Sequence, residues 1–347
     1  MVIAVTGAAG MLGSQVVARL TGDGAEVVGI DLREPAAAAP GISYRHLVGD
    51  VRDPAVLRIA FGRVDAVVHC AAALPSYPAA QIRSIVVDGS RAVLDAARAA
   101  GVPRLVYISS TAVYGLPRQV PTPEDHPYAP VDTYSTAKAD AERLALGYRD
   151  ADLVLPVLRP KTFLGPGRMG LFSMLFQWAQ EGRNFPVLGD GRVRIQMLHV
   201  ADLVDAIVTV LRAPAAVAND TYNIGAAQFG TLRDDFQAVL DAAGHGRRVV
   251  SLPARPTRAA LGLLERAGLS PVYGRLLHKL MDDSYVDIGR ARRRLDFTPR
   301  HSNQDAVLEA FRWWQAHRTG GAAPTSSGRT SRDPWRQGVL AAAKFFF

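Results

Sequence analysis

The chain opens with a short apolar run, a glycine-rich turn and a stretch whose apolar residues recur at helical spacing. In "VIAVTGAAGMLGSQVVARL" the turn holds Gly7, Gly10 and Gly13, and Met11 and Leu12 begin the helical stretch. Glycines let the backbone approach a pyrophosphate at a helix amino terminus, where N–H groups and the helix dipole favour negative charge. The pattern therefore predicts a strand, turn and helix that bind a dinucleotide, with these five residues in contact with it.

The next strand-like run ends on a carboxylate. "AEVVGIDLRE" brings Asp31 to the end of that strand, where it can accept hydrogen bonds from both ribose hydroxyls. A carboxylate at this point repels a 2′-phosphate, so the predicted cofactor is NAD in preference to NADP. Arg33 keeps NADP open as an alternative, because an arginine near this site can accommodate the phosphate.

Strand and helix patterns alternate through the amino-terminal half. Strand-like runs at 64–73 and 104–115 flank a helical pattern at about 81–100. Such alternation is typical of a parallel sheet with helices on both faces. The predicted fold class is therefore α/β, a Rossmann-like doubly wound parallel sheet with a smaller C-terminal substrate domain.

Residues at two further strand ends extend the predicted cofactor site. Asp50 and Val51, in "VGDVRD", follow a third short strand, where they can meet an adenine. Ala71, Ala72 and Ala73 end the fourth strand with minimal side chains, so a cofactor can pass close to the backbone. Each small residue alone also suits ordinary tight packing. Together with the glycine turn, they are assigned to the cofactor.

The stretch "DTYSTAKADAE" places Tyr134 and Lys138 four residues apart among good helix formers. On a helix, residues at this spacing lie on one face, so the ammonium group can favour the ionised form of the phenol. A phenol has a pKa of about 10 and needs such a cation to act as a base near neutrality. By itself, the pair is more often a solvated surface feature, so its role depends on the rest of the chain.

Composition excludes several classes of protein. Hydrophobic residues make up 48% and charged residues 21% of the 347 residues, an ordinary balance for a soluble folded chain. The formal charge is +8, but the carboxyl-terminal tail holds four of the basic residues against one aspartate, and no nucleic-acid partner is predicted. The single cysteine, Cys70, excludes a disulfide framework and a cysteine-rich zinc site, and no metal is predicted. Without a long apolar run, no membrane span is predicted and the expected location is cytoplasmic.

A series of short motifs resembles the extended short-chain dehydrogenase/reductase family, and its nucleotide-sugar epimerases and dehydratases in particular. The resemblance runs from residue 2 to about 318. It rests on TGAAGMLG (6–13), Asp31, GDV (49–51), HCAAA (69–73), SSTAVYG (109–115), YSTAK (134–138), LRPKTFLGPG (158–167), GDG through HVADLVDA (189–206) and ARRRLDFTP (291–299). The order and spacing of these motifs identify Tyr134 and Lys138 as a catalytic pair.

The resemblance implies a mechanism. Tyr134, assisted by Lys138, removes the proton of a substrate hydroxyl while hydride passes from the same carbon to NAD, which leaves a ketone. Ser110 orients that hydroxyl, and Thr111 and Ser109 are the nearby alternatives. Tyr134 and Lys138 also belong to the cofactor site.

The residues before Val113 bear on the reaction that follows. In the 4,6-dehydratases the family pattern has an Asp-Glu pair there, which carries protons on neighbouring carbons, and the sugar-acid decarboxylases keep a glutamate. This chain has Thr111 and Ala112. Without a carboxylate, the residues suit an epimerase of a nucleotide sugar, in which the keto sugar turns over and takes hydride back on its other face. The alternatives are a dehydrogenase or ketoreductase of another secondary alcohol, and a NAD-binding regulator without catalysis.

The substrate side departs from the family pattern. Thr162 stands where the pattern has a substrate-binding asparagine, and Ile195 falls where nucleotide-sugar epimerases often have an arginine. Arg192 and Arg194 lie close by, either to meet a diphosphate or to face solvent. The residues assigned to the substrate are Thr111, Thr162, Arg192 and Arg194, and Pro160 is added to the cofactor site.

The resemblance and the helical patterns divide the chain. Residues 1–160, with 198–225 returning to them, are expected to form the NAD-binding domain. Residues 161–197 and 226–318 are expected to form the substrate-binding domain, and 319–347 read as a linker-like tail.

Two further expectations concern helices. Asp202 is expected to cap the first turn of the helix in "VADLVDAIVTV". A homodimer is expected through the helices near 81–100 and 134–150, because the family pairs these helices as a four-helix bundle. The small and apolar residues that would permit close approach are Ala92, Val93, Ala96 and Ala97.

Overall fold

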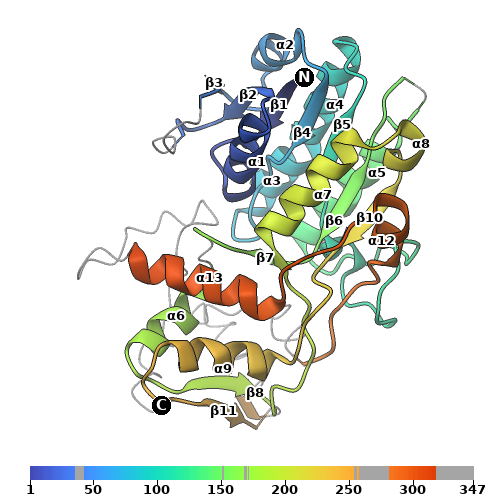
Figure 1. Ribbon diagram of the computed structural model, residues 1–347. Coiled ribbons are helices and arrows are strands. Elements are labelled where there is room, and N and C mark those ends of the chain that lie inside the picture. The colour runs from blue at the N-terminus through green and yellow to red at the C-terminus, as the bar shows by residue number, and fades with distance from the viewer. Residues whose placement is uncertain are drawn as a thin grey trace.

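The structure is a computed structural model, and it describes residues 1–35, 43–150, 152–167, 170, 172–253, 256–257 and 281–317. Its centre is a seven-stranded parallel sheet in the order β10-β6-β5-β4-β1-β2-β3 (Figure 1). The strands are β1 Val2–Thr6, β2 Glu26–Asp31, β3 Arg45–Val48, β4 Ala66–His69, β5 Leu105–Ile108, β6 Val157–Pro160 and β10 Thr221–Ile224. Strand order reverses beside β1, which confirms the predicted Rossmann-like fold class.

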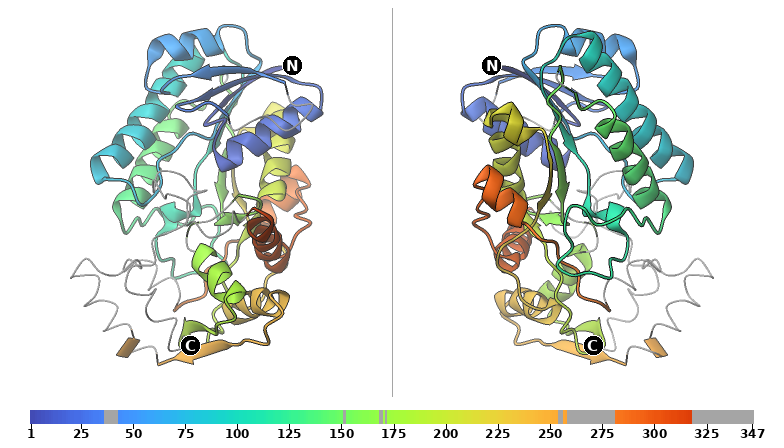
Figure 2. Two further views of the ribbon diagram at one scale, coloured as in Figure 1. Left: turned by 90° about the vertical axis from the view of Figure 1, so that its left-hand side faces the viewer. Right: turned by 90° about the vertical axis from the view of Figure 1, so that its right-hand side faces the viewer.

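Helices cover both faces of the sheet, so the central strands β4 and β5 are buried along their whole length and consist mostly of apolar residues. Two views at right angles to Figure 1 show the two helical layers (Figure 2). One core holds residues of α1 (Met11–Gly22), α7 (Val200–Arg212) and α12 (Gly289–Leu295), and the other those of α2 (Pro54–Phe61), α4 (Gly89–Ala99) and α5 (Thr133–Leu146).

A smaller group of elements lies below the sheet in the view of Figure 1. It comprises α6 (Phe172–Gln180), β8 (Phe185–Leu188), α9 (Leu232–Ala242), β11 (Val249–Leu252) and α13 (Asn303–Ala316). Aromatic side chains such as Phe176, Trp178 and Phe311 fill its core. The short strands β7 (Phe163–Leu164) and β9 (Leu198–His199) pair where the chain passes between this group and the sheet. The helix α12 lies between β11 and α13 in sequence but packs on the sheet, with Ala291 and Leu295 buried there.

The helix predicted near 81–100 is confirmed, but it contains a π-turn. Helix α3 (Ala79–Arg83) leads into the π-turn η1 (Ser84–Asp88) and then into α4. The Ser90 hydroxyl donates to the backbone oxygen of Val86 at 2.6 Å and lies 3.1 Å from the hydroxyl of Tyr107 on β5. A π-turn adds one residue to the helix, and neither spacing nor propensity had indicated it.

The prediction that Asp202 caps α7 was wrong. His199 is the N-cap residue, and its Nδ1 accepts the N–H of Ala201 at 3.1 Å. Asp202 is buried and accepts the backbone N–H groups of Arg300 and His301, each at 3.1 Å. The carboxylate therefore fastens the segment that precedes α13 to the amino end of α7.

The prediction that four small or apolar residues of α4 permit the close approach of a second subunit was also partly wrong. Val93 and Ala97 are fully buried against the sheet of their own chain and cannot meet a partner. Ala92 and Ala96 are half-buried on α4 and remain available. The predicted tail at 319–347 lies outside the described residues, as do residues 258–280 of the predicted substrate domain. Among the described helices, none has the length and apolarity that crossing a membrane requires.

Candidate active site

The glycine-rich turn joins β1 to α1 at the carboxyl edge of the sheet. Gly7 has φ = 70°, and a Cβ added there would lie 2.9 Å from the backbone of Ala71. A Cβ on Gly13 would lie 2.0 Å from the backbone oxygen of Gly7. The same oxygen accepts the N–H of Gly10 at 2.9 Å. Only residues without side chains allow the turn, the helix and the end of β4 to come this close.

The amino terminus of α1 fits a dinucleotide pyrophosphate. The structure describes all of α1; its first turn contains no acidic residue, and its N-cap, Gly10, has no side chain to occupy the N–H groups. These groups and the helix dipole are the features that bind phosphate oxygens in such turns. Met11 and Leu12 are buried at the start of the helix, where they anchor it to the core.

Asp31, the last residue of β2, lies beside this turn, as expected for a residue at the end of that strand. Its carboxylate accepts the N–H of Ala9 at 3.0 Å and the N–H of Arg33 at 3.1 Å. The Arg33 side chain is half exposed, with its Nε 3.6 Å from the same carboxylate. The turn and the acidic residue are thus joined directly by a hydrogen bond. Arg33 pairs with Asp31, so its charge is partly compensated where a 2′-phosphate would have to bind.

The remaining cofactor candidates come from the loops after β3 and β4. Asp50 pairs with Arg52, whose Nε lies 2.9 Å from it, and this side-chain hydrogen bond lowers the pKa of Asp50. Val51 is buried in the core that also holds residues of α2 and α4. Ala71 donates its N–H to the hydroxyl of Thr6 at 3.3 Å. In the same loop Ala72 is exposed and Ala73 is buried.

Tyr134 and Lys138 lie in the first two turns of α5. The helix begins with a capping box, in which the Asp132 carboxylate accepts the N–H of Ser135 at 2.7 Å and the Ser135 hydroxyl accepts the N–H of Asp132 at 3.0 Å. Tyr134 is half-buried, whereas Lys138 is only 5% exposed. The pair is therefore not the solvated surface feature that the spacing alone also allowed.

Lys138 is held beneath the end of β5. Its Nζ donates to the backbone oxygen of Ile108 at 3.0 Å. Burial lowers the pKa of Lys138 to about 8, against the opposing effects of Glu142 and Cys70. The same burial raises the pKa of Cys70 to about 12 and lowers that of His69 to about 3. The ammonium group thus lies among groups that are themselves neutral near pH 7, apart from Glu142.

The loop after β5 carries the hydroxyl candidates. Ser110 is half-buried, and its Oγ accepts the N–H of Ala112 at 3.1 Å, so that it caps the short 3-10 helix η2 (Thr111–Tyr114). The Thr111 hydroxyl is buried and donates to the backbone oxygen of Pro160 at 3.3 Å. The third candidate, Ser109, is buried and donates to Glu142. Only Ser110 therefore retains partial exposure among the three.

Sequence reasoning missed a buried ion pair behind this loop. Glu142 and Arg159 are 0% and 4% exposed, and the Nε of Arg159 donates to Oε1 of Glu142 at 2.8 Å. Arg159 also donates to the hydroxyl of Tyr114 at 2.6 Å. Glu142 lies four residues after Lys138 and eight after Tyr134, on the same helical face. That continued spacing of four was the one sequence signal that pointed to it.

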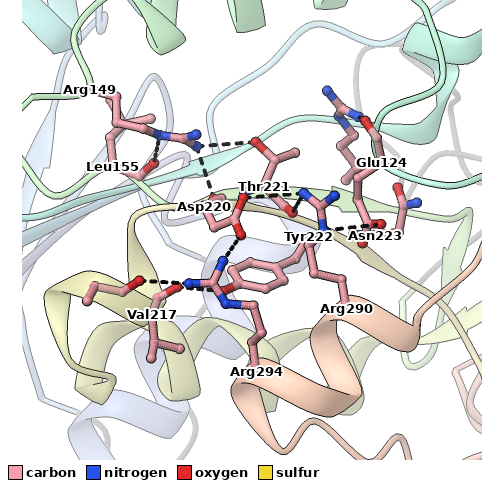
Figure 3. Close-up of polar contacts among 12 residues, drawn as sticks. Glu124, Arg149, Leu155, Val217, Asp220, Thr221, Tyr222, Asn223, Arg290 and Arg294 are labelled. Carbon is pink, nitrogen blue, oxygen red and sulfur yellow. Dashed lines mark hydrogen bonds and ion pairs between the residues drawn. The ribbon is translucent and has the colours of Figure 1, made fainter.

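Polar contacts continue from Tyr114 to β10, the outer strand of the sheet, and Figure 3 shows the contacts around Asp220 and Asn223. The Tyr114 hydroxyl donates to Asn223 on β10 at 2.8 Å, and the Asn223 N–H donates to Glu124 at 3.0 Å. Arg290 and Arg294 of α12 converge on Asp220, at the start of β10. These contacts attach α12 to the sheet and hold the segment that leads into it.

The structure does not bring together all the residues that were assigned to the substrate. Thr162 is exposed, and its backbone oxygen accepts the N–H of Leu198 at 3.0 Å. Arg192 is 82% exposed and faces solvent. The Arg194 guanidinium lies 4.9 Å from the ring centre of Phe229 and 5.1 Å from that of Tyr285. Two aromatic rings therefore hold the guanidinium of Arg194.

Four features together define a dinucleotide-binding enzyme of the Rossmann type: the order of the strands in the sheet, the glycine-rich turn, the Asp31 carboxylate, and the helix that carries Tyr134 and Lys138. The model of the NAD dependent epimerase/dehydratase family matches residues 3–225. The chain belongs to this family. The predicted cofactor, NAD, is confirmed by the family's dependence on it, and so is the family resemblance on which the site was assigned.

Relatives that are named as epimerases and relatives that are named as dehydratases both match almost the whole chain. An uncharacterized protein, y4nG, from Sinorhizobium fredii is 33% identical over 97% of this chain and 84% of its own length. UDP-arabinose 4-epimerase 1 of Arabidopsis thaliana is 26% identical over 94% and 82%. A dTDP-glucose 4,6-dehydratase of Streptomyces niveus is 29% identical over 92% and 94%. Sequence similarity therefore supports the family without selecting between its two reactions.

Solved structures share the fold. The UDP-glucose 4-epimerase of Thermotoga maritima, solved with UDP-glucose, superposes with a TM-score of 0.75 at 22% identity, over 91% of this chain and 99% of the other. MoeE5, solved with UDP-glucuronic acid and NAD, has a TM-score of 0.72 at 25% identity, with the same two coverages. The chain thus shares the fold of these enzymes over its matched length.

Proposed function

We propose that the protein is an NAD-dependent epimerase that inverts one carbon of a nucleotide sugar through a transient keto sugar. The observation that carries this proposal is an intact Tyr134 and buried Lys138 beside a loop in which Thr111 and Ala112 offer no carboxylate. A proton donor and acceptor for the hydroxyl is present, whereas a proton carrier for the neighbouring carbons is missing from the loop.

The carboxylate nearest in this network, Glu142, is unsuited to replace that carrier. One of its oxygens accepts from Tyr128 at 2.8 Å and from Arg159 at 2.8 Å, and the other accepts from Ser109. It is fully buried, so a substrate cannot reach it. Elimination of water needs an acid and a base on adjacent carbons, and this arrangement supports redox-neutral inversion instead.

The chain's own residues hold the cofactor and move one proton. We assign the cofactor to Gly7, Gly10, Met11, Leu12, Gly13, Asp31, Asp50, Val51, Ala71, Ala72, Ala73, Tyr134, Lys138 and Pro160. NAD, when bound, supplies oxidation and then reduction at the sugar carbon. Tyr134 takes the hydroxyl proton and later returns it, while Ser110 orients the hydroxyl and Lys138 favours the ionised phenol.

Substrate binding is proposed for Thr111, Thr162, Arg192 and Arg194. The two arginines lie on the segment before β9, which belongs with the proposed substrate-binding domain of 161–197 and 226–318. Arg194 is the stronger candidate for a diphosphate, because the rings of Phe229 and Tyr285 fix its guanidinium while Arg192 remains in solvent. A dehydrogenase or ketoreductase of another alcohol is the second candidate, since the same tyrosine, lysine and serine would serve it.

The test is an incubation with UDP-, dTDP- and GDP-sugars, followed by proton NMR of the sugar and by absorbance of NADH. The expected result is inversion at one carbon over many turnovers without accumulated NADH. Stoichiometric NADH with a stable keto product would favour the dehydrogenase. Loss of water from the sugar, with a 4-keto-6-deoxy product, would reject the epimerase in favour of a dehydratase.

A further inference from the structure

Glu142 occupies the centre of a buried polar cluster behind the proposed catalytic pair. It lies on α5 one helical turn after Lys138, and its side chain is completely buried. Its oxygens accept hydrogen bonds from three elements: Ser109 at the end of β5, Tyr128 in the loop before α5, and Arg159 on β6. A single carboxylate therefore connects α5, the helix that carries Tyr134, with the end of β5 and with β6.

Hydrogen bonds of this cluster hold both ends of the loop that carries Ser110 and Thr111. Ser109, at the start of the loop, donates directly to Glu142. Tyr114, at its other end, accepts from Arg159 at 2.6 Å, and Arg159 is itself paired with Glu142. Four residues lie between these anchors, and Ser110 and Thr111, which are assigned to the substrate, are the first two of them. Their position relative to Tyr134 therefore depends on the one ion pair.

The charges in this region also depend on Glu142. Lys138 and Arg159 bring two buried cations, and Glu142 is the carboxylate that they share. Burial disfavours the charged form of Lys138, while the negative charge of Glu142 favours it. Six other ionisable groups in the described residues interact electrostatically with Lys138 or Glu142: His69, Cys70, Tyr107, Tyr114, Tyr128 and Arg149.

We propose that Glu142 is a positioning residue of the reaction: its carboxylate holds the Ser110 loop in register with Tyr134 and supplies the negative charge that the buried Lys138 requires. The proposal rests on the proposed function for the role of Tyr134 and Lys138. It goes beyond that function because Glu142 touches neither substrate nor cofactor and acts through Ser109 and Lys138.

The first part of the proposal, that Glu142 supplies negative charge to Lys138, can be tested without measuring turnover. The chain has only four lysines, 138, 161, 279 and 344, so protein with ¹³C at lysine Cε gives few NMR signals, and Lys138→Arg assigns the one of interest. In the wild type this signal should titrate near pH 8. In Glu142→Gln, its midpoint should fall by about one pH unit, because the nearby negative charge is lost. Glu142→Asp keeps the charge and should leave the midpoint within about half a unit. An unchanged midpoint in Glu142→Gln would overturn this part.

The second part, that Glu142 holds the Ser110 loop in register with Tyr134, is tested by Ser109→Ala, which removes the link from Glu142 to the loop and keeps the ion pair. We expect kcat to fall about 10- to 100-fold with KM and NAD affinity nearly unchanged, because the substrate hydroxyl is no longer aligned. Ser173→Ala is the matched control. It deletes another buried hydroxyl, which lies on α6 and donates to the backbone oxygen of Gly170 at 2.7 Å. This variant should leave kcat unchanged. Equal kcat values in the two variants would overturn the proposed alignment. If the wild type converts no nucleotide sugar, the proposed function fails, and the lysine titration alone decides the role of Glu142.

Discussion

The Nζ of Lys138 lies 3.0 Å from the backbone oxygen of Ile108 and donates a hydrogen bond to it. This contact holds a cation under the carboxyl end of β5, immediately before the loop that carries Ser110. Because Lys138 is one turn after Tyr134 on α5, the same contact orients the helical face that bears the phenol. This arrangement supports the proposed catalytic role of both residues and leads to the first two predictions.

Replacing Tyr134 with Phe is expected to reduce kcat by about two to four orders of magnitude, the usual effect of losing a general base. The fold and NAD binding should persist, since only a half-buried hydroxyl is removed. Kinetics with the active sugar and NAD titration measure the two effects. Tyr148→Phe, which deletes a hydroxyl near the far end of α5, is the control and should retain activity. Near wild-type activity of Tyr134→Phe would refute the assignment.

Turnover is expected to decline as pH rises through about 8, where the buried Lys138 loses its proton. The direction follows from the charge: below this pH the ammonium is present and favours the phenolate, and above it the charge is lost. Lys138→Arg should move the alkaline decline to higher pH, because a guanidinium stays protonated. The pH dependence of kcat measures both. A decline at the same pH in the arginine variant would assign it to another group.

NAD is expected to bind at least about tenfold more tightly than NADP, a difference of about 1.4 kcal/mol. The Asp31 carboxylate accepts the N–H of Ala9 beside the glycine turn, and in the proposed cofactor site it would meet the ribose hydroxyls and repel a 2′-phosphate. Asp31→Asn should narrow the difference, and Arg33→Ala should widen it. Dissociation constants for both cofactors test this. Tighter binding of NADP by the wild type would mean that Arg33 governs the pocket.

The buried Asp235 is expected to make stability fall as pH rises from about 4 to 6. Burial raises its pKa to about 6, so within this window the unfolded chain releases the proton that the native state retains. The loss should be on the order of 2 to 3 kcal/mol in the free energy of unfolding, from about 1.4 kcal/mol per pKa unit. Urea unfolding at pH 4.5 and 7 measures it. Asp235→Asn should abolish this contribution, whereas Asp241→Asn, an exposed position on the same helix, should keep it.

A homodimer through α4 and α5 stays a prediction, now with fewer candidate residues. Ala92 and Ala96 are half-buried on α4, so Ala92→Glu with Ala96→Glu should convert a dimer to a monomer by placing charge in the interface. Light scattering at micromolar concentration measures the mass. Ala215→Glu, on the opposite face of the sheet, is the control. A wild type that is monomeric under these conditions would contradict the prediction.

Much of the fold and of the cofactor site could be predicted because their signals are local. The glycine turn, the carboxylate at the end of β2 and the spacing of Tyr134 and Lys138 each lie within a short stretch, and hydrophobic periodicity reports strands and helices directly. The family model and the parallel sheet confirm the predicted family, fold class and cofactor. The cap of α7 was not predicted correctly, because the Asp202 carboxylate that the sequence suggested as a cap instead accepts backbone N–H groups of the distant Arg300 and His301, and His199 caps the helix.

The tertiary structure alone decided which hydroxyls and charges meet. Ser109, Tyr128 and Arg159 lie 33, 14 and 17 residues from Glu142 in sequence, and their contacts with it exist only because β5, β6 and α5 are packed side by side. The same packing buries Lys138 and leaves Arg192 in solvent, although both are basic residues in recognisable motifs. The sequence by itself determined the class of enzyme, since periodicity and motif spacing are properties of neighbouring residues. The protonation and alignment of the site depend on burial and on long-range contacts, which no local pattern contains.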